Sequence, residues 1–445
     1  MADITVDQVD RHDGSSPAAA AATPASVWRN RDFLKLLGGE SVSFFGSEIT
    51  QFALPLVALL TLQATPFQLG LVTVAWSAPF LLSLFVGVWV DRRRRRPVLI
   101  ATNLGRAAAV AVVPLSAALG MLSMPQLYLA AFLIGALTVP FDLAYLSYVP
   151  SLVDRRQLAD ANGKLVTSAT LADIGGRPMA GFLVELLTAP ITLVVDAMSY
   201  LCSAVCLMTI SKREPEPAPP IERRTLRMGL SDIREGLRLV FGNPHLRALA
   251  GEAATFNLFE SLILIVFQYY ALVTLGLRPV LLALVLTSMG VGALAGSLVA
   301  GRLQRLFGFG RTLLVATAVG CGAPALLLVV TGSGGGSVAV MALSFFVHGV
   351  GFVVANILAV TFRQSVTPDR LQGRMHASYR LLIYGSIPVG GLLGGALGST
   401  VGLRPTLAIG VAGLFSAIFW ILLSSIRKLQ SPPDPVGATD VPVGT

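Results

Sequence analysis

Four glutamates lie inside long apolar stretches of the chain, where a carboxyl group would have little water around it: Glu40, Glu48, Glu252 and Glu260. An ionised side chain in hydrocarbon costs roughly 3 kcal/mol on insertion scales, so charges in such stretches tend to be functional or paired. A carboxyl group in surroundings of low dielectric also binds a proton more readily than it does in water. We therefore expect Glu48 and Glu260, each near the middle of its stretch, to bind protons or contact substrate. Alternatively, both serve only as hydrogen-bond or ion-pair partners between helices.

Other polar residues lie in the same kind of apolar stretch as these glutamates and could act with them. Gln51 follows Glu40 with Ser43 and Ser47 between them, at the spacing i, i+3, i+7 and i+11, which forms one polar stripe on a helix. His348 and Asn356, in a later apolar stretch, face either a cavity or a neighbouring helix. The predicted set for proton coupling and the substrate cavity is Glu48, Glu260, Glu40, Glu252, Gln51, His348 and Asn356.

Two further pairs of opposite charge occur in apolar stretches. Arg106 and Asp142 lie at similar depth in neighbouring stretches, and we expect them to form a structural ion pair. Asp173 and Arg177 are four residues apart, so they face each other on a helix and can neutralise each other. If Asp173 points elsewhere, Arg177 becomes a candidate for binding an anion.

The composition places these residues in a membrane protein. Apolar residues make up 54% of the 445 residues and charged residues only 13%, whereas a soluble globular protein carries about 25% charged residues. The sequence contains no phosphate-binding loop and no convergent set of nucleophile and base, so we expect neither an enzyme nor a cofactor. The four histidines are too scattered for a metal site. The three cysteines form no disulfide framework, and we expect them to serve in packing.

A bilayer is crossed by about 20 helical residues, and twelve stretches are long and apolar enough. They are residues 34–62, 68–90, 97–120, 125–149, 164–187, 190–210, 249–275, 279–301, 311–332, 337–362, 374–401 and 405–426. Basic residues gather in the even-numbered connections, so the positive-inside rule places both termini in the cytoplasm. This distribution accounts for the net charge of +9 without nucleic-acid binding. Glu40 and Glu252 then lie near the cytosolic end, where they could close an inner gate with Arg370 or Arg374.

The two halves of the chain are related by an internal repeat. Four residues of the first stretch align without gaps on four of the seventh, namely Gly39, Glu40, Phe44 and Glu48 on Gly251, Glu252, Phe256 and Glu260. Six spans per half make the repeat parallel, and such halves can rock about a central site to expose it alternately to the two sides of the membrane. The predicted fold is therefore an all-α membrane protein of twelve transmembrane helices in two pseudo-symmetric six-helix bundles.

The repeat divides the chain into five predicted segments. The bundles are expected at residues 31–210 and 249–427, and a cytosolic linker with an amphipathic helix is expected at residues 211–248. Residues 1–30 and 428–445 are expected to be disordered cytosolic tails. Acidic residues near the start argue against a signal peptide.

The connection between the second and third stretches resembles the signature loop of the major facilitator superfamily. It reads GVWVDRRRRRP, and its matching residues are Gly87, Asp91, Arg92 and Arg95 or Arg96. The resemblance covers residues 30–427. It implies that this loop braces the cytosolic side of the bundle and helps to set the balance of inward- and outward-facing states. It also implies that the first, fourth, seventh and tenth helices line a central cavity.

The layout further resembles the branch of this superfamily that exports macrolides and siderophores. The segments NRDFLKLLGGE, VPSLVDRRQLADANG and FGNPHLRAL carry this resemblance, and GGRPMAGF is similar to the glycine–proline signature of antiporters. It implies a secondary transporter of the cell membrane that exports amphipathic small molecules, such as drugs or natural products, in exchange for protons. A siderophore or lysophospholipid carrier, or a membrane sensor or scaffold that transports nothing, are the alternatives. The expected partners are a small-molecule substrate, protons and the bilayer, and we expect a monomer.

Overall fold

The computed structural model describes residues 27–212, 214 and 226–431 of the chain. Every regular element in this part of the chain is a helix, which confirms the predicted all-α class. Most of the predicted tails at residues 1–30 and 428–445, and much of the first part of the predicted linker at residues 211–248, lie outside the described residues.

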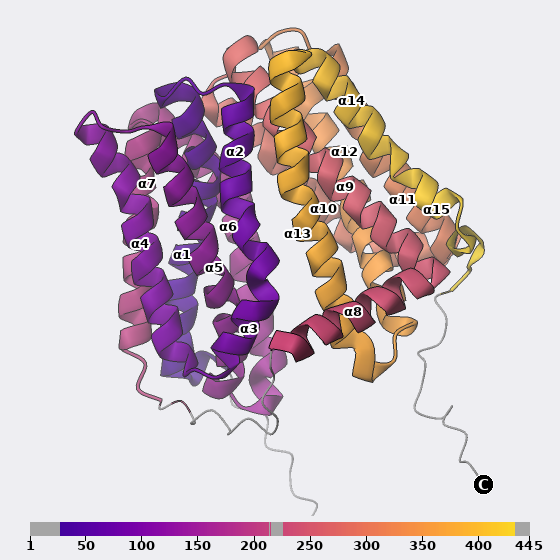
Figure 1. Cartoon of the computed structure of the whole chain (residues 1–445), viewed down its shortest axis with the longest axis horizontal. Coiled ribbons are helices and arrows are strands. Elements are labelled where there is room, and N and C mark those ends of the chain that lie inside the picture. The colour runs from indigo at the N-terminus through magenta and orange to yellow at the C-terminus, as the bar shows by residue number, and fades with distance from the viewer. Residues whose placement is uncertain (1–26, 213, 215–225, 432–445) are drawn as a thin grey trace, which may run out of the picture.

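The first half of the chain folds into a bundle of antiparallel helices (Figure 1, indigo to magenta). The side-chain oxygen of Asn30 caps the first long helix by accepting from the backbone N–H groups of Asp32 and Phe33, both at 3.1 Å. The elements are η1 (Val27–Arg29), α1 (Arg31–Leu56), η2 (Val57–Thr61), α2 (Pro66–Ser77), η3 (Ala78–Leu82), α3 (Ser83–Asp91), α4 (Arg95–Ala118), α5 (Met124–Leu152), η4 (Arg155–Gln157), α6 (Leu158–Leu186) and α7 (Ala189–Met208).

The second half repeats this order after the amphipathic helix α8. As in the first half, its first long helix ends in a π-helical turn and its second begins with a proline. The elements are α8 (Leu226–Gly242), α9 (Pro244–Tyr269), η5 (Tyr270–Thr274), α10 (Pro279–Phe307), α11 (Phe309–Gly322), η6 (Ala323–Val329), α12 (Gly335–Ser365), α13 (Asp369–Thr400), α14 (Leu403–Ser416), α15 (Ile418–Leu422) and η7 (Ser425–Lys428).

The number of membrane spans remains a prediction. Among the described residues, ten helices are long and apolar enough to cross a membrane, and the bent pair Pro66–Leu82 with Phe85–Asp91 would make an eleventh. The helix α6, which corresponds to the fifth predicted span, is not among them. It carries Asp173 and Arg177 among small polar residues, and these lower its hydropathy.

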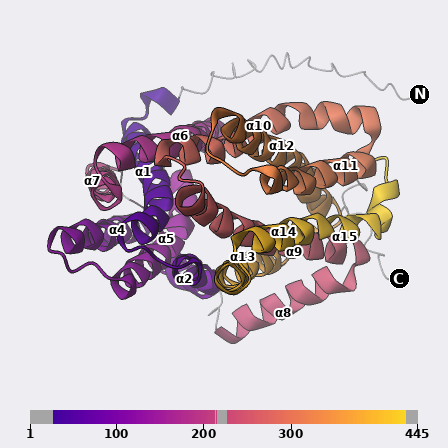
Figure 2. The same ribbon diagram turned by 90° about the horizontal axis from the view of Figure 1, so that it is seen from above.

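The two halves meet along two pairs of helices, α2 with α13 and α6 with α10 (Figures 1 and 2). Close approach of α2 and α13 requires glycine, because a Cβ at Gly70 would lie 2.6 Å from the carbonyl oxygen of Gly391. In the same way, a Cβ at Gly181 of α6 would lie 2.7 Å from the side chain of Ala283 on α10. Small residues therefore let the backbones of the two halves touch.

Polar contacts between the halves gather at the end where α2 and α10 begin, which we call the joined end. The Oε1 atom of Glu185, at the end of α6, accepts from the backbone N–H of Val280 at 2.9 Å, and its other oxygen contacts Arg278. The hydroxyl of Ser399, near the end of α13, accepts from the backbone N–H of Phe67 at 3.1 Å. Each half thus caps the first turn of a helix in the other half.

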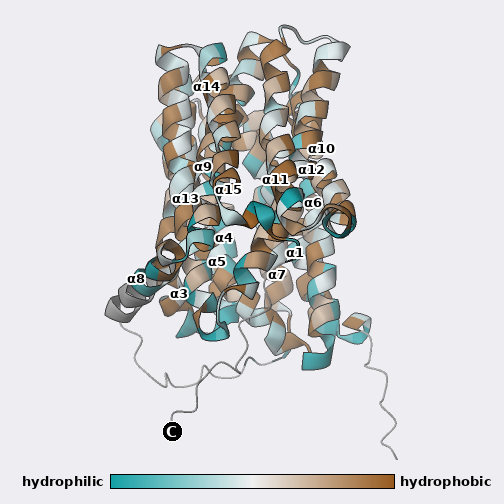
Figure 3. Ribbon diagram, turned by 90° about the vertical axis from the view of Figure 1, so that its right-hand side faces the viewer, coloured by the Kyte–Doolittle hydropathy of each residue, from teal (hydrophilic) through white to brown (hydrophobic). Residues whose placement is uncertain are grey.

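Away from the joined end, the halves make fewer contacts. The helix α3 continues α2 but packs mainly on α5 of its own half. The helix α8 crosses the base of the second half and packs on α13 and α9, where the backbone of Arg374 approaches Gly236 (Figure 1). Figure 3 shows hydrophobic residues along the long helices and hydrophilic residues near this lower end. The two halves are therefore joined at one end and diverge toward the end where α1 begins.

We predict that Gly292→Val destabilises the second half. A Cβ at Gly292 would collide with the backbone carbonyl of Phe346, because α10 and α12 are in close contact there. Overpacking of this kind costs about 1–3 kcal/mol, so the purified protein should unfold at a lower temperature in a thermal melt. Gly301→Val in the same helix is the matched control, since nothing lies within 4 Å of a Cβ there. Equal melting temperatures for the two variants would contradict this packing.

Candidate functional site

An acid–imidazole pair lies inside the second half, between α9 and α12. The Nε2 atom of His348 lies 3.3 Å from Oε2 of Glu260, and the two side chains are 1% and 12% exposed. The imidazole ring stacks on the ring of Phe256, with 5.6 Å between their centroids. Both members of the pair belong to the predicted cavity set, and the structure brings them together.

A backbone carbonyl determines which edge of His348 faces the glutamate. Nδ1 of the ring lies 2.7 Å from the carbonyl oxygen of Gly320. Because a carbonyl only accepts, Nδ1 must carry a hydrogen and donate it. Nε2 is then an acceptor in the neutral ring and a donor in the cation. A carboxylate beside a neutral ring would place two lone pairs face to face, so the 3.3 Å contact is attractive only when one of the two atoms carries a proton.

Glu260 also lines a cavity of about 370 Å³ between the two halves, which we call the interface cavity. Residues of α1, α2, α9 and α13 form its walls, and the predicted cavity residue Gln51 lies on the α1 side. Other polar groups come from Thr50, Asn257 and Gln268, while the apolar wall includes Leu54, Trp76, Leu264 and Ile265. A cavity of mixed polarity that contains one titratable acid fits a ligand with an apolar body and a polar or charged group.

In the first half, one arginine joins two carboxylates. Nε of Arg177 lies 3.1 Å from Oε2 of Glu48, and its NH2 group lies 2.7 Å from Oδ1 of Asp173. The three side chains are only partly exposed, at 24%, 19% and 38% respectively. Arg177 therefore balances Glu48 as well as its neighbour on the same helix. Glu48 and Glu260 align in the repeat but have different partners.

Glu40 is fully buried in the first half and connects to Arg106 through two neutral side chains. Its Oε1 atom accepts from the hydroxyl of Ser203 at 2.8 Å, and that hydroxyl accepts from the amide of Asn103 at 2.8 Å. The amide oxygen of Asn103 in turn contacts the guanidinium of Arg106. Glu40 therefore belongs to a buried network within one bundle and does not line the interface cavity.

The expected ion pair between Arg106 and Asp142 is not formed among the described residues. Instead, the guanidinium of Arg106 lies over two aromatic rings, 3.9 Å from the ring centre of Phe141 and 4.4 Å from that of Tyr200. These cation–π contacts offset part of its desolvation. Matched depth on neighbouring helices does not determine which side chains meet.

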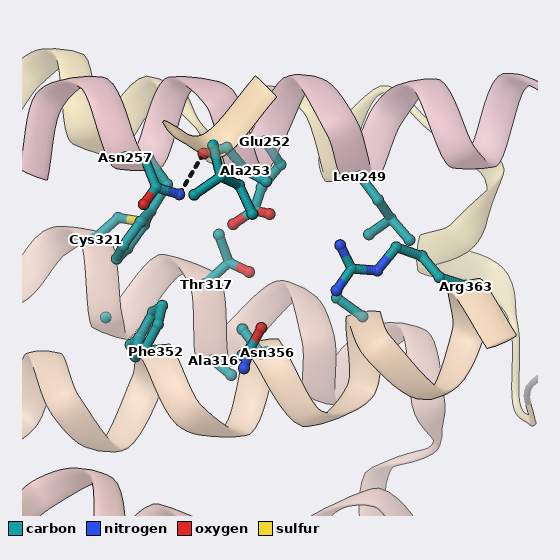
Figure 4. A pocket seen from close by; sticks show the side chains of 15 residues that line it. Leu249, Glu252, Ala253, Asn257, Ala316, Thr317, Cys321, Phe352, Asn356 and Arg363 are labelled. Atoms are coloured by element: carbon teal, nitrogen blue, oxygen red, sulfur yellow. Dashed lines mark hydrogen bonds between the residues drawn. The ribbon is translucent and has the colours of Figure 1, made fainter. Parts of the chain in front are cut away.

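A second cavity lies entirely within the second half, and we call it the inner pocket. It has a volume of about 200 Å³ and is bounded by α9, α11, α12 and α13. Figure 4 shows that Glu252, Thr317, Asn356 and Arg363 extend toward the same space. The predicted cavity set is thus divided, with Glu252 and Asn356 at the inner pocket and Gln51 and Glu260 at the interface cavity.

The predicted inner gate is not closed in this structure. In the part of the chain that the structure describes, no ion pair joins Glu40 or Glu252 to Arg370 or Arg374, and Arg374 instead contacts Glu235 of α8. The halves diverge at this end, which keeps Glu40 of the first half apart from Arg370 and Arg374 of the second.

The signature loop between α3 and α4 contacts the segment that follows α7. The backbone N–H groups of Arg95 and Arg96 donate to the carboxylate of Glu214 at 2.8 and 3.1 Å. The guanidinium of Arg96 donates to the carbonyl oxygens of Leu207 and Met208, which end α7. This loop therefore braces one end of the first bundle, where Gly87, Asp91 and Arg92 also lie.

Two buried charges of the site region are absent from the predicted site set. Asp196 of α7 is fully buried and accepts from the hydroxyl of Ser199 at 2.9 Å. Its position in an apolar stretch is the same signal that singled out the four glutamates. Arg363 is 8% exposed and lies within α12, although the predicted span ends at residue 362 and leaves it in a basic connection.

Comparison with known proteins shows the class to which this architecture belongs. Residues 22–438 match the profile of a family described as transmembrane secretion effectors. The multidrug efflux pump Tap of Mycolicibacterium fortuitum is 28% identical over 407 residues, covering 88% of this chain and 95% of Tap. The enterobactin exporter EntS of Citrobacter koseri is 24% identical over 382 residues, covering 84% of this chain and 87% of EntS.

Solved structures support the fold. A bacterial homologue of the iron transporter ferroportin, in an inward-facing state, superposes with a TM-score of 0.72 at 17% identity, covering 90% of this chain and 99% of that one. The nucleoside transporter NupG, as its D323A mutant, also gives a TM-score of 0.72, at 13% identity over 88% of this chain and 99% of that one.

The family match over most of the chain identifies a multi-pass membrane transporter of the major facilitator superfamily, and the solved structures agree with its fold. Within that superfamily, the chain belongs to the transmembrane secretion effector family. The resemblance derived from the signature loop is therefore confirmed.

We predict that Arg177→Gln destabilises the first half by about 1–2 kcal/mol, because it leaves two partly buried carboxylates without their shared cation. A thermal melt should show a lower unfolding temperature. Adding Glu48→Gln to this variant should recover part of the loss, since one of the two carboxylates is then neutral. An unchanged melting temperature for Arg177→Gln, or no recovery in the double variant, would contradict the bridging role of Arg177.

Proposed function

We propose that this protein is a proton-coupled exporter of amphipathic small molecules and that the pair of Glu260 and His348 carries the proton. The single observation that carries the proposal is the position of Glu260, which contacts His348 on one side and lines the interface cavity on the other. One carboxyl group can thus respond both to a proton and to a ligand in the cavity.

The coupling follows from competition at Glu260. With one proton shared between Nε2 and Oε2, the pair is neutral overall. It is then either a neutral imidazole beside a carboxylic acid or an imidazolium beside a carboxylate. A cationic or hydrogen-bonding ligand in the interface cavity stabilises the carboxylate form and so favours release of the proton. Conversely, a proton that binds Glu260 from the other side of the membrane weakens the binding of the ligand. Exchange of ligand for proton therefore drives export against a concentration gradient when protons flow inward.

Alternating access requires that the joined end opens while the opposite end closes. Under the predicted topology, with both termini in the cytoplasm, the joined end faces outward, and the divergence of the halves corresponds to an inward-facing state. Opening the joined end breaks the contacts of Glu185 and Ser399 with the other half. Polar caps of this kind exchange readily with water, so they suit a gate that must open and reclose.

The remaining predicted residues serve as supports in this proposal. Glu48 is held by Arg177, which leaves it less able to exchange a proton than Glu260. Glu40 belongs to the buried network around Ser203, and the signature loop braces the end of the first bundle. We further propose that the protein functions in the cell membrane as a monomer.

Tap is named as a multidrug efflux pump and EntS as an enterobactin exporter, and together they favour export over uptake. A siderophore or lysophospholipid carrier would use the same cavity with another ligand. A sensor that transports nothing would show no exchange of labelled compound across the membrane, and counterflow in proteoliposomes separates these functions.

We predict that Glu260→Gln abolishes uphill transport while leaving exchange intact. Proteoliposomes with an acidic lumen would be given ethidium, a fluorescent amphipathic cation, and accumulation driven by the pH gradient would be recorded. Glutamine keeps the shape of the side chain but cannot exchange a proton, so accumulation should fall to the level of empty vesicles. Counterflow of preloaded ethidium requires no proton and should continue, although at higher ethidium concentrations, because glutamine, like the protonated glutamate, binds a cation more weakly.

Two variants serve as controls in the same assay. Glu235→Gln removes a carboxylate of α8 that lines neither cavity, so this variant should accumulate ethidium as wild type does. Glu48→Gln should show a smaller defect than Glu260→Gln. Wild-type accumulation by Glu260→Gln would refute proton transfer by this residue. Lysophosphatidylcholine exchange without ethidium exchange would instead indicate a lipid carrier.

A further inference from the structure

Two opposite charges face the inner pocket without meeting each other. No ion pair within 4.0 Å joins Glu252 of α9 to Arg363 of α12 among the described residues, although both side chains line this cavity of about 200 Å³. Figure 4 shows the carboxylate and the guanidinium extending toward the same space from different helices. The space of the cavity lies between them.

Arg363 is oriented toward the pocket by packing, while part of its hydrogen-bonding capacity is unused. The residue is 8% exposed, and the centre of its guanidinium lies 4.3 Å from the ring centre of Tyr379, which covers one face. Its Nε atom has no hydrogen-bond partner in the described part of the chain. A buried guanidinium with an unused donor is costly unless an acceptor occupies the adjacent space.

Neutral polar groups surround the space between the two charges. The hydroxyl of Thr317, on α11, is buried and likewise has no partner among the described residues. Asn356, also on the wall, is an exposed residue, so a small polar molecule can reach the pocket from solvent. The remainder of the wall is largely apolar and includes Phe256, Phe352 and Ala359.

We propose that the inner pocket binds a small zwitterion, with its ammonium group at Glu252 and its carboxylate at Arg363. An ion of one sign is attracted by one of these residues and repelled by the other, whereas a zwitterion satisfies both. A carboxylate also matches the forked donors of a guanidinium. Water can fill the same space, but it neutralises neither charge.

This site is distinct from the site of the proposed export of amphipathic molecules. It lies within one bundle, whereas the interface cavity lies between the two bundles. Asn257 lines both cavities, but Glu260 does not line the inner pocket, and Glu252 and Arg363 do not line the interface cavity. Its test requires neither transport nor a pH gradient. Failure of this proposal therefore leaves the proposed function untouched, and the reverse also holds.

The test is isothermal titration calorimetry of the purified full-length protein with amino acids of increasing charge separation. The probes are glycine, β-alanine, γ-aminobutyrate and 5-aminopentanoate, and n-butylamine and butyrate serve as ions of single charge. One chain length should bind more tightly than its shorter and longer neighbours, because it matches the gap between the two charges. Neither singly charged probe should bind comparably.

Variants locate the binding. Glu252→Gln and Arg363→Gln should each weaken binding of the best probe by about thirtyfold or more, the loss expected when one member of a buried charge pair is left without its partner. Ala359→Met keeps both charges but fills the pocket, so it should also prevent binding. If a charge variant fails to fold, this variant still tests whether the probe binds in the inner pocket. Glu235→Gln and Arg311→Gln, which remove one charge of each sign outside the pocket, should bind as wild type does.

The proposal is overturned if no chain length binds, or if butyrate or n-butylamine binds as tightly as the best zwitterion. It is also overturned if Ala359→Met retains wild-type affinity, since the probe then binds elsewhere.

Discussion

A carboxyl group inside a membrane protein needs a proton or a cationic partner, and the polar architecture of this transporter follows from that constraint. Glu48 has Arg177, Glu40 has a hydrogen-bond chain that ends at Arg106, and Glu260 has an imidazole. These partners differ in one decisive property. A guanidinium keeps its charge under all physiological conditions, whereas an imidazole gains and loses a proton near neutral pH. The acid beside the imidazole is therefore the one suited to proton exchange.

The internal repeat thus provides two similar bundles whose equivalent acidic residues have different partners. Glu48 and Glu260 occupy equivalent positions in the repeat. Glu48 forms an ion pair with Arg177 of α6, whereas Glu260 lies between His348 and the interface cavity. The first bundle also buries its charges in networks within itself. The joined end does not share this asymmetry, because each half caps a helix of the other there. We infer that the repeat preserves the movement while the chemistry is concentrated in the second half.

Much of the fold was predictable from local patterns, but the partners of the site residues were not. Apolar stretches, Pro and Gly positions and the signature loop are local features, and they indicate helices and family. The contact of Glu260 with His348 joins residues far apart in sequence, and helical periodicity says nothing about which neighbour a side chain meets. Arg106 illustrates this limit, since its two aromatic partners lie on α5 and α7 and replace the expected Asp142. Arg363 is likewise predicted in a connection, because the apolar stretch ends at residue 362 while the helix α12 continues to Ser365.

The central claim is that Glu260 and His348 share and exchange a proton, and infrared difference spectroscopy tests it without knowledge of the substrate. Spectra of the protein in lipid would be recorded as the pH is lowered. The account predicts a carboxylic acid band that grows as protons bind, is missing from Glu260→Gln, and changes its pH midpoint in His348→Gln. A wild-type spectrum in which no such band depends on Glu260 would contradict the account.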